Sequence, residues 1–126
     1  MLTVTTEFRK GILFVRLKGE LTKDTVYKLN KKVTNIIKDN GIRNVVFNLT
    51  NLKVIDMKGI STLLYNYEIC KKNDGRSLLC GNNSNINKKL RKTRLLNYIY
   101  EISDELSAIN IINLRWNYGI RKSYNW

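Results

Sequence analysis

The sequence lacks the residues from which most catalytic and metal centres are built. Its 126 residues include no histidine, no proline and only two cysteines. Without histidine, the commonest general base and the commonest metal ligand are both missing. No GxxxxGK[ST] or GxGxxG phosphate-binding motif occurs, and no paired-carboxylate motif is present. We therefore expect a protein that is not an enzyme and that holds no metal and no cofactor.

Long apolar runs are absent as well. No run approaches the roughly 18 to 20 residues that span a bilayer, so we expect no transmembrane helix. The first ten residues, MLTVTTEFRK, lack the basic and apolar regions of a signal peptide. Cys70 and Cys80 lie in apolar patterns, which favours buried free thiols in a reducing cytoplasm over a disulfide.

Acidic residues are scarce. Against 23 Lys and Arg stand 10 Asp and Glu, which gives a formal net charge of +13. Such an excess is typical of proteins that bind nucleic acid, acidic partners or anionic membrane surfaces. The composition is also rich in Asn, Lys and Ile, the bias of an AT-rich coding sequence. Compositional drift on solvated faces therefore explains the charge about equally well.

What is present is an alternation of strand-like and helix-like segments in a chain long enough for one domain. Apolar runs and turn residues predict strands at 3–8, 12–18, 43–49, 76–80 and 98–100. Arg9-Lys10-Gly11 joins the first two strands as a hairpin. Short loops between alternating elements predict a single α/β domain. Its mixed, mostly parallel sheet would carry the N-terminal hairpin and about four helices packed on it.

Helical periodicity and capping residues predict the four helices. The first follows Thr22, its candidate N-cap, and stops at Gly41. Its apolar face would consist of Val26, Leu29, Val33, Ile36 and Ile37. The second helix spans 58–72. The third begins at Ser84 as cap and carries Ile86, Leu90, Leu95 and Leu96. The fourth begins at Ser103.

The stretch from Asn44 to Leu64 is the centre of the predicted domain. A strand at 43–49 that is apolar on both faces leads into a loop at 50–57 and then into the second helix. Asp56 is well placed as the N-cap, where its carboxylate would accept the backbone N–H of Lys58 or Gly59. Polar backbone exposed at a helix start is a frequent location of binding sites.

Three segments together resemble the STAS domain family, whose founding members are bacterial anti-sigma factor antagonists. They are LKGELTKDT at 17–25, VVFNLTNLKVIDMKGISTLLYNY at 45–67 and GRSLLCG at 75–81. The order of the predicted elements agrees with that family. The resemblance covers about residues 3–112. It predicts a STAS-like domain at 1–112, followed by a basic and aromatic C-terminal extension at 113–126.

The resemblance implies a non-catalytic, cytoplasmic protein-interaction module in bacterial transcription regulation. Its partner would be an anti-sigma factor of the serine kinase-like kind, and a homodimer is a further option. The surface would comprise the 50–57 loop and the start of the following helix. The partner-binding residues that the resemblance implies are Thr22, Asp56, Met57, Lys58, Gly59, Ser61 and Thr62.

The chain departs from the family at its regulatory position. Regulatory members carry a phosphorylated serine just before the helix-start glycine, within an I-D-S-S-G motif. Here the motif is Ile55-Asp56-Met57-Lys58-Gly59, so Lys58 stands at the phosphoacceptor position and cannot accept that phosphate. Thr22 likewise replaces an acid of the family's G-x-L-D turn. We therefore expect the usual serine phosphoswitch to be absent.

A local basic patch supports other functions. Residues 81–100 contain no acid and five cations, namely Lys88, Lys89, Arg91, Lys92 and Arg94. With the aromatic tail, this patch could bind nucleic acid or an anionic surface. A solvated helix face is the simpler interpretation. A second alternative is a STAS domain that binds a small molecule or nucleotide at Lys58-Gly59. We favour the protein-interaction module.

Overall fold

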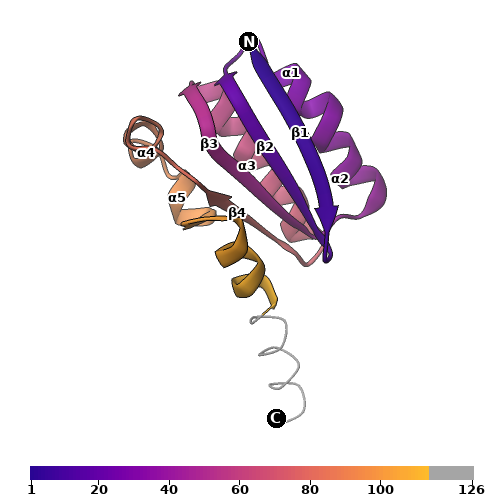
Figure 1. Ribbon diagram of the computed structural model, residues 1–126. Helices are drawn as coiled ribbons and strands as arrows, with labels where there is room; N and C mark the ends of the chain where they lie inside the picture. The colour runs from indigo at the N-terminus through magenta and orange to yellow at the C-terminus, as the bar shows by residue number, and fades with distance from the viewer. Residues whose placement is uncertain (114–126) are drawn as a thin grey trace, which may run out of the picture.

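A five-stranded sheet with helices on both faces forms the described part of the computed structural model, residues 1–113 (Figure 1). The strand order is β1-β2-β3-β4-β5, with β1 antiparallel to β2 and all other pairs parallel. The α/β fold with an N-terminal hairpin is confirmed. The strands are β1 (Leu2–Arg9), β2 (Ile12–Leu21), β3 (Asn44–Ile55), β4 (Arg76–Cys80) and β5 (Tyr100–Ile102). The predicted extension lies, from residue 114 onward, outside the described residues.

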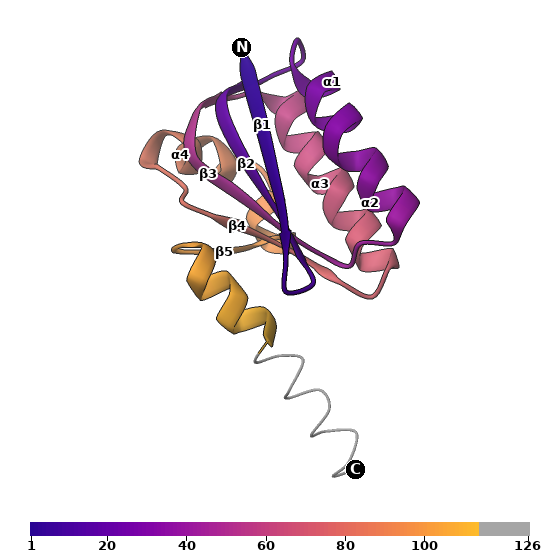
Figure 2. The ribbon, with the colours of Figure 1, turned by 45° about the vertical axis from the view of Figure 1, so that its right-hand side comes forward.

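The helices divide unequally between the two faces of the sheet (Figure 2). On one face lie α1 (Val26–Leu29), η1 (Asn30–Thr34), α2 (Asn35–Asn40) and α3 (Met57–Lys72). Further along, α4 (Ser84–Arg91) and α5 (Leu95–Tyr98) contribute to the same core. The other face is covered by a helix at 105–113. Alternating residues of β2 supply both cores, since Leu13 and Val15 face the first while Ile12 and Phe14 face the second.

The first predicted helix is one continuous helix with a wide turn inside it. Its buried residues Leu29, Val33 and Ile37 recur every four positions, a spacing that keeps them on one face of a helix. The five-residue π-helical turn η1 lies within this stretch and contains the buried Val33. Ile36, predicted for the buried face, is 37% exposed.

Thr22 is not the cap of that helix, because the helix begins at Val26. The Thr25 hydroxyl accepts the N–H of Thr22 at 2.9 Å and donates to the carbonyl of Glu20 at 2.7 Å. These bonds close a turn before the helix and leave Thr22 half-buried at the surface of the domain.

The predicted loop at 50–57 is also wrong, because β3 continues to Ile55 and β2 continues to Leu21. The inward residues Leu49, Leu52 and Ile55 are three apart rather than two. The pairing of β3 with β2 shifts register twice along this stretch. A bulged strand of this kind loses the two-residue alternation by which a strand is identified in a sequence.

The third predicted helix is two helices. The Thr93 hydroxyl donates to the carbonyl of Leu90 at 2.8 Å and accepts the N–H of Leu95 at 3.2 Å. One side chain therefore bonds the last turn of α4 and the first residue of α5. The strand expected at 98–100 is β5, at Tyr100–Ile102. The last helix is capped by Asp104 rather than Ser103, since Asp104 Oδ1 accepts the N–H of Ser107 at 2.8 Å.

Candidate functional site

The start of α3 lies at the carboxyl ends of the parallel strands β2 and β3 and is held there by Asp56. Asp56 Oδ1 accepts the backbone N–H of Gly59 at 2.9 Å, which confirms the predicted N-cap. Its second oxygen, Oδ2, accepts the backbone N–H of Lys23 at 2.9 Å. The backbone N–H of Asp56 donates to the carbonyl of Leu21 at 3.3 Å. One residue therefore ties the helix start to the end of β2 and to the turn that follows it.

Gly59 fits this junction because it has no side chain. A Cβ built on Gly59 would stand 2.3 Å from the carbonyl oxygen of Leu21 and 2.9 Å from Cγ1 of Ile55. The first of these neighbours is backbone and cannot rotate away. The first turn of α3 thus packs directly on the ends of β2 and β3, and glycine allows that close approach.

The electrostatics of the helix start depend on the Asp56 carboxylate. Burial alone would raise its pKa, but the backbone N–H groups of Gly59, Lys23 and Lys58 hold the pKa below its usual value. Asp56 is therefore a carboxylate at neutral pH. Its negative charge at the helix N-terminus offsets the unfavourable cation Lys58 in the same turn.

The predicted partner-binding residues lie together, but they differ in exposure. Met57 is 64% exposed, and Lys58 and Ser61 are also exposed on α3. Gly59 is buried, and Thr62 is buried with 9% of its surface exposed. A partner at this surface would therefore contact Met57, Lys58 and Ser61. Gly59 and Thr62 contribute only by supporting the helix.

The structure adds one residue to this surface and corrects the place of another. Val54, 40% exposed, belongs to the 50–57 segment predicted for the surface, but it lies near the end of strand β3 and not in a loop. Lys23 is exposed and donates its backbone N–H to Asp56. Nothing in the local pattern around Lys23 indicates that contact, because the two residues are 33 positions apart.

The start of α4 lies at the same edge of the sheet. Asn83, not the predicted Ser84, is its cap, since Asn83 Oδ1 accepts the N–H of Ile86 at 3.0 Å. Asn83 Nδ2 donates to the carbonyl of Leu52 in β3 at 2.9 Å. Between β3 and this helix start is a hollow of about 540 Å³, whose rim includes Lys18 and Lys53.

The basic patch predicted near α4 is present at the surface. All five of its cations are exposed, and within residues 1–113 none of them takes part in an ion pair. They are Lys88, Lys89, Arg91, Lys92 and Arg94. The apolar residues Ile86 and Leu90 of the same helix point into the core, as predicted.

A polar cluster on the second face of the sheet was not predicted. Arg16 in β2 donates from Nε and Nη2 to the two carboxylate oxygens of Glu105, each at 2.8 Å, and from Nη2 to Glu7 at 2.8 Å. Asn48 Nδ2 donates to Glu105 at 2.7 Å. The hydrogen bonds from Arg16 lower the pKa of Glu105. The cluster fastens the helix at 105–113 to the sheet. The one sign of it in the sequence is an arginine inside the otherwise apolar strand ILFVRL.

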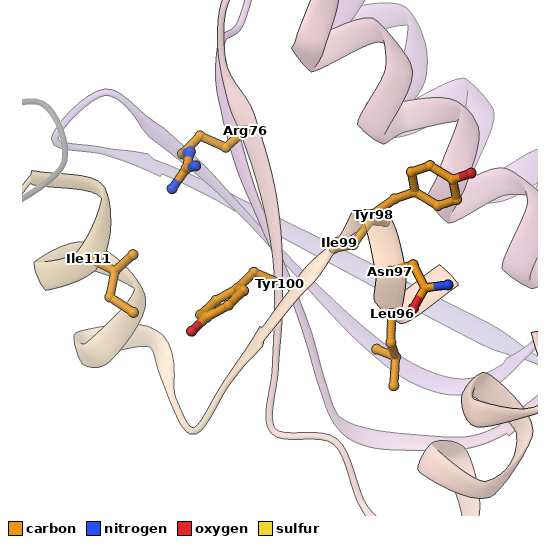
Figure 3. Close-up of a pocket in the computed structure, with 7 residues that line it drawn as sticks. All are labelled: Arg76, Leu96, Asn97, Tyr98, Ile99, Tyr100 and Ile111. Carbon is orange, nitrogen blue, oxygen red and sulfur yellow. The ribbon is translucent and has the colours of Figure 1, made fainter. Parts of the chain in front are cut away.

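A small hollow of about 310 Å³ lies beside β5 (Figure 3). The exposed side chains of Tyr98 and Tyr100 border it and point in opposite directions. The other residues around it do not gather polar groups at one point, so the hollow has no arrangement that suggests a ligand.

Two further findings concern residues 1–113 only. No group of three or more His, Cys, Asp or Glu is placed to hold a metal ion. No helix is both long enough and apolar enough to cross a membrane. The two cysteines are free and buried, as predicted, and burial raises the pKa of Cys80 to about 12.

Comparison with known proteins gives a consistent result. The family model of the STAS domain matches residues 3–109. An anti-sigma F factor antagonist from Paenibacillus polymyxa is 25% identical over 108 residues, which cover 86% of this chain and 92% of that protein. An anti-sigma factor antagonist from Mycobacterium paratuberculosis has the same fold, with a TM-score of 0.80, 17% identity, and coverage of 90% and 95% of the two chains. The Bacillus cell fate determinant SpoIIAA in its phosphorylated form also has this fold, with a TM-score of 0.67, 17% identity, and coverage of 88% and 99%.

Proposed function

The chain belongs to the STAS domain family, and on that premise we propose that it is a non-catalytic protein-interaction module that acts in the manner of an anti-sigma factor antagonist. Its partner would be an anti-sigma factor of the serine kinase-like kind, met in the cytoplasm. The observation that carries the proposal is the start of α3, where exposed Met57 and Lys58 stand on a junction held in place by Asp56 and Gly59.

The surface has the chemistry of a protein contact. Met57 and Val54 offer apolar area, and a methionine side chain adapts its shape to a partner. Lys58 and Lys23 add charge around that area, as the polar rim of an interface does. The residues beneath are fixed by the hydrogen bonds of Asp56, so little conformational entropy is lost when a partner binds.

The second part of the proposal is that the serine phosphoswitch is absent from this surface. Lys58 stands where the family pattern has the phosphoacceptor serine, and a lysine has no hydroxyl to phosphorylate. Ser61 is the exposed hydroxyl nearest to it on α3, while Thr62 is buried. Binding would therefore be controlled by the amount of the two proteins and not by phosphate at position 58.

A binding experiment tests the docking surface. The kinase-like anti-sigma factors of the source organism would be titrated with the wild type, Met57→Ala, Lys58→Glu and Lys72→Glu, by calorimetry. Lys72 is an exposed lysine at the opposite end of α3 and serves as the matched control. We expect at least tenfold weaker binding for the first two variants and less than twofold change for Lys72→Glu. Equal binding by all four proteins would contradict the proposal.

A labelling experiment tests the loss of the switch. The same kinase-like proteins, with ATP, are expected to leave α3 of the wild type unlabelled. In Lys58→Ser, which restores a hydroxyl at the family's position, we expect phosphate at position 58. Label on Ser61 of the wild type would overturn the proposed absence of phosphorylation control while leaving the docking surface intact.

The basic patch supports a second candidate function, binding of nucleic acid or an anionic surface. The favouring observation is the exposure of all five cations without an ion pair in residues 1–113. Binding of this kind weakens steeply with salt because counterions are released. A salt-sensitive shift of DNA or RNA that is lost in Lys88→Glu/Lys89→Glu, together with unaltered anti-sigma factor binding in Met57→Ala and Lys58→Glu, would favour it over the first.

A further inference from the structure

The edge strand β1 offers a row of backbone groups that no other strand within residues 1–113 uses. A two-residue turn, Lys10-Gly11, joins β1 to β2, with both residues at positive φ. In such a hairpin the flanking pair Arg9 and Ile12 exchange hydrogen bonds, so the odd-numbered residues of β1 bond to β2. The N–H and C=O groups of the even-numbered residues therefore point outward, away from the sheet. They belong to Leu2, Val4, Thr6 and Phe8.

Two lysines of the neighbouring helix cover the first half of this row. Lys28 Nζ donates to the carbonyl of Leu2 at 3.4 Å, and Lys32 Nζ donates to the carbonyl of Val4 at 2.7 Å. The spacing is matched, because four helical residues rise about 6 Å and two strand residues about 6.8 Å. Figures 1 and 2 both show this helix running beside β1 in the same direction.

The second half of the row is open. The next residue at the four-residue spacing is Ile36, which carries no donor. Within residues 1–113, no hydrogen bond reaches the outward carbonyls of Thr6 or Phe8. The Phe8 side chain is 62% exposed and Ile36 is 37% exposed. An exposed strand edge with apolar neighbours is a template for pairing with another chain.

A groove of about 690 Å³ follows the covered half of the edge. Its wall on the helix side consists of Tyr27, Lys28, Lys31 and Lys32, and no acidic residue lines it. Tyr27 is 60% exposed, and the exposed side chain of Lys31 forms no hydrogen bond or ion pair within residues 1–113. The groove therefore combines strand backbone, one aromatic ring and three positive charges.

We propose that this edge is a docking site for an extended acidic segment of a partner protein, which adds to the sheet as a further strand beside β1. The segment would form backbone hydrogen bonds with the outward groups of β1. Its carboxylates would draw Lys28 and Lys32 off the backbone carbonyls, because a carboxylate is the stronger acceptor. The site is distinct from the start of α3 and does not depend on the function proposed there.

Charge argues for an acidic occupant rather than a second copy of this chain. Another copy would bring its own three groove lysines and a net charge of +13 to the same edge. Lysine on an edge strand is a common device against self-pairing. The same lysines that oppose a basic strand attract an acidic one.

The test uses a fluorescent seven-residue peptide that alternates glutamate and valine. We expect it to bind the full chain, and the anisotropy titration to show at least tenfold weaker binding for Lys28→Glu/Lys32→Glu. Lys31→Glu should weaken binding at least threefold. This single variant keeps the bonds from Lys28 and Lys32 to the backbone carbonyls, so it tests the proposal even if the double variant is unstable. Lys88→Glu/Lys89→Glu makes the same change of charge elsewhere and should alter binding less than threefold. Lys58→Glu should leave it unchanged.

Backbone pairing is tested separately from charge. Two N-methylated peptides, one methylated at the valines and one at the glutamates, keep every charge but lose alternate N–H donors. We expect one of them to bind at least tenfold more weakly, and peptide addition to slow hydrogen exchange at the outward amides of Val4 and Thr6. Any of four results would overturn the proposal. They are an equal loss of peptide affinity in both double variants, equal binding by all three peptides, no binding at millimolar peptide, and pairing of two copies of the chain through β1.

Discussion

The starts of α3 and α4 invite comparison because both lie at the same edge of the sheet and follow consecutive strands. Each is capped by a short side chain whose two polar atoms make two bonds. The oxygens of Asp56 accept from Gly59 and from Lys23. Asn83 accepts from Ile86 with its oxygen and donates to the carbonyl of Leu52 with its nitrogen.

The difference between the caps follows from their chemistry. A carboxylate can only accept, so Asp56 is joined to a backbone N–H in the turn after β2, whereas an amide can also donate to a carbonyl of β3. The α3 start is further locked by the close contact of Gly59, and it presents Met57 and Lys58. The α4 start presents the exposed polar residues Ser84 and Asn85, and the cations of that helix lie in its last turn. A rigid start with apolar exposure suits protein recognition better than one that offers small polar side chains alone.

The largest expected effect is at the packing of the α3 start. Gly59→Ala would force the backbone of α3 away from Leu21, and we expect a loss of about 3 kcal/mol in the free energy of unfolding. Gly11→Ala meets no neighbouring atom and pays only for its positive φ, about 1 kcal/mol. Denaturant melts measure both. If the two variants lose the same stability, the close packing of α3 on β2 is not what distinguishes this helix start.

The next effect concerns the cap itself. Asp56→Ala removes the acceptor of both the Gly59 and Lys23 amides, and we expect a loss of about 2 kcal/mol, the upper end for an N-cap. Hydrogen exchange should accelerate at both amides. Unaltered exchange at Lys23 would show that Asp56 caps the helix but does not hold the preceding turn.

A smaller effect tests which residue caps α4. Asn83→Ala should cost about 1 kcal/mol because the Ile86 amide loses its acceptor. Ser84→Ala, one position later, should change stability by less than about 0.5 kcal/mol, as for an ordinary surface substitution. If thermal or denaturant melts show a larger loss of stability for Ser84→Ala than for Asn83→Ala, the cap is Ser84, as the sequence predicted.

The smallest effect is a pH dependence that only the Asp56 cap should show. Its pKa is lower in the folded chain than the ordinary 3.8, so its ionised form stabilises the fold above that pH. The stabilisation is lost as the pH falls through the lowered folded pKa. We therefore expect the stability advantage of the wild type over Asp56→Asn to be constant near neutral pH and to shrink below 3.8. The stability advantage of the wild type over Asn83→Ala should not change as Asp56 titrates. If both stability advantages decline in parallel below pH 3.8, the pH dependence does not come from the Asp56 cap.

Much of the fold and part of the site could be predicted from local pattern. Apolar periodicity located the strands and helices, and Asp56 was correctly identified as a cap because its type and position suffice. The loop expected at 50–57 was wrong because bulges break the alternation in β3. Ser84 was chosen over Asn83 because both residue types cap helices and only the carbonyl of Leu52 distinguishes them.

Local pattern in the amino-acid sequence was enough to predict the alternation of elements and the family resemblance, and it led to the expectation that Lys58 stands at the family's phosphoacceptor position. Which distant groups meet follows only from the folded chain. Asp56 and Lys23 are 33 positions apart, Lys28 and Leu2 are 26 apart, and Arg16 and Glu105 are 89 apart. Periodicity records only what a residue shares with neighbours one or two turns away. Contacts between elements depend on strand register and helix placement, which the whole core sets together.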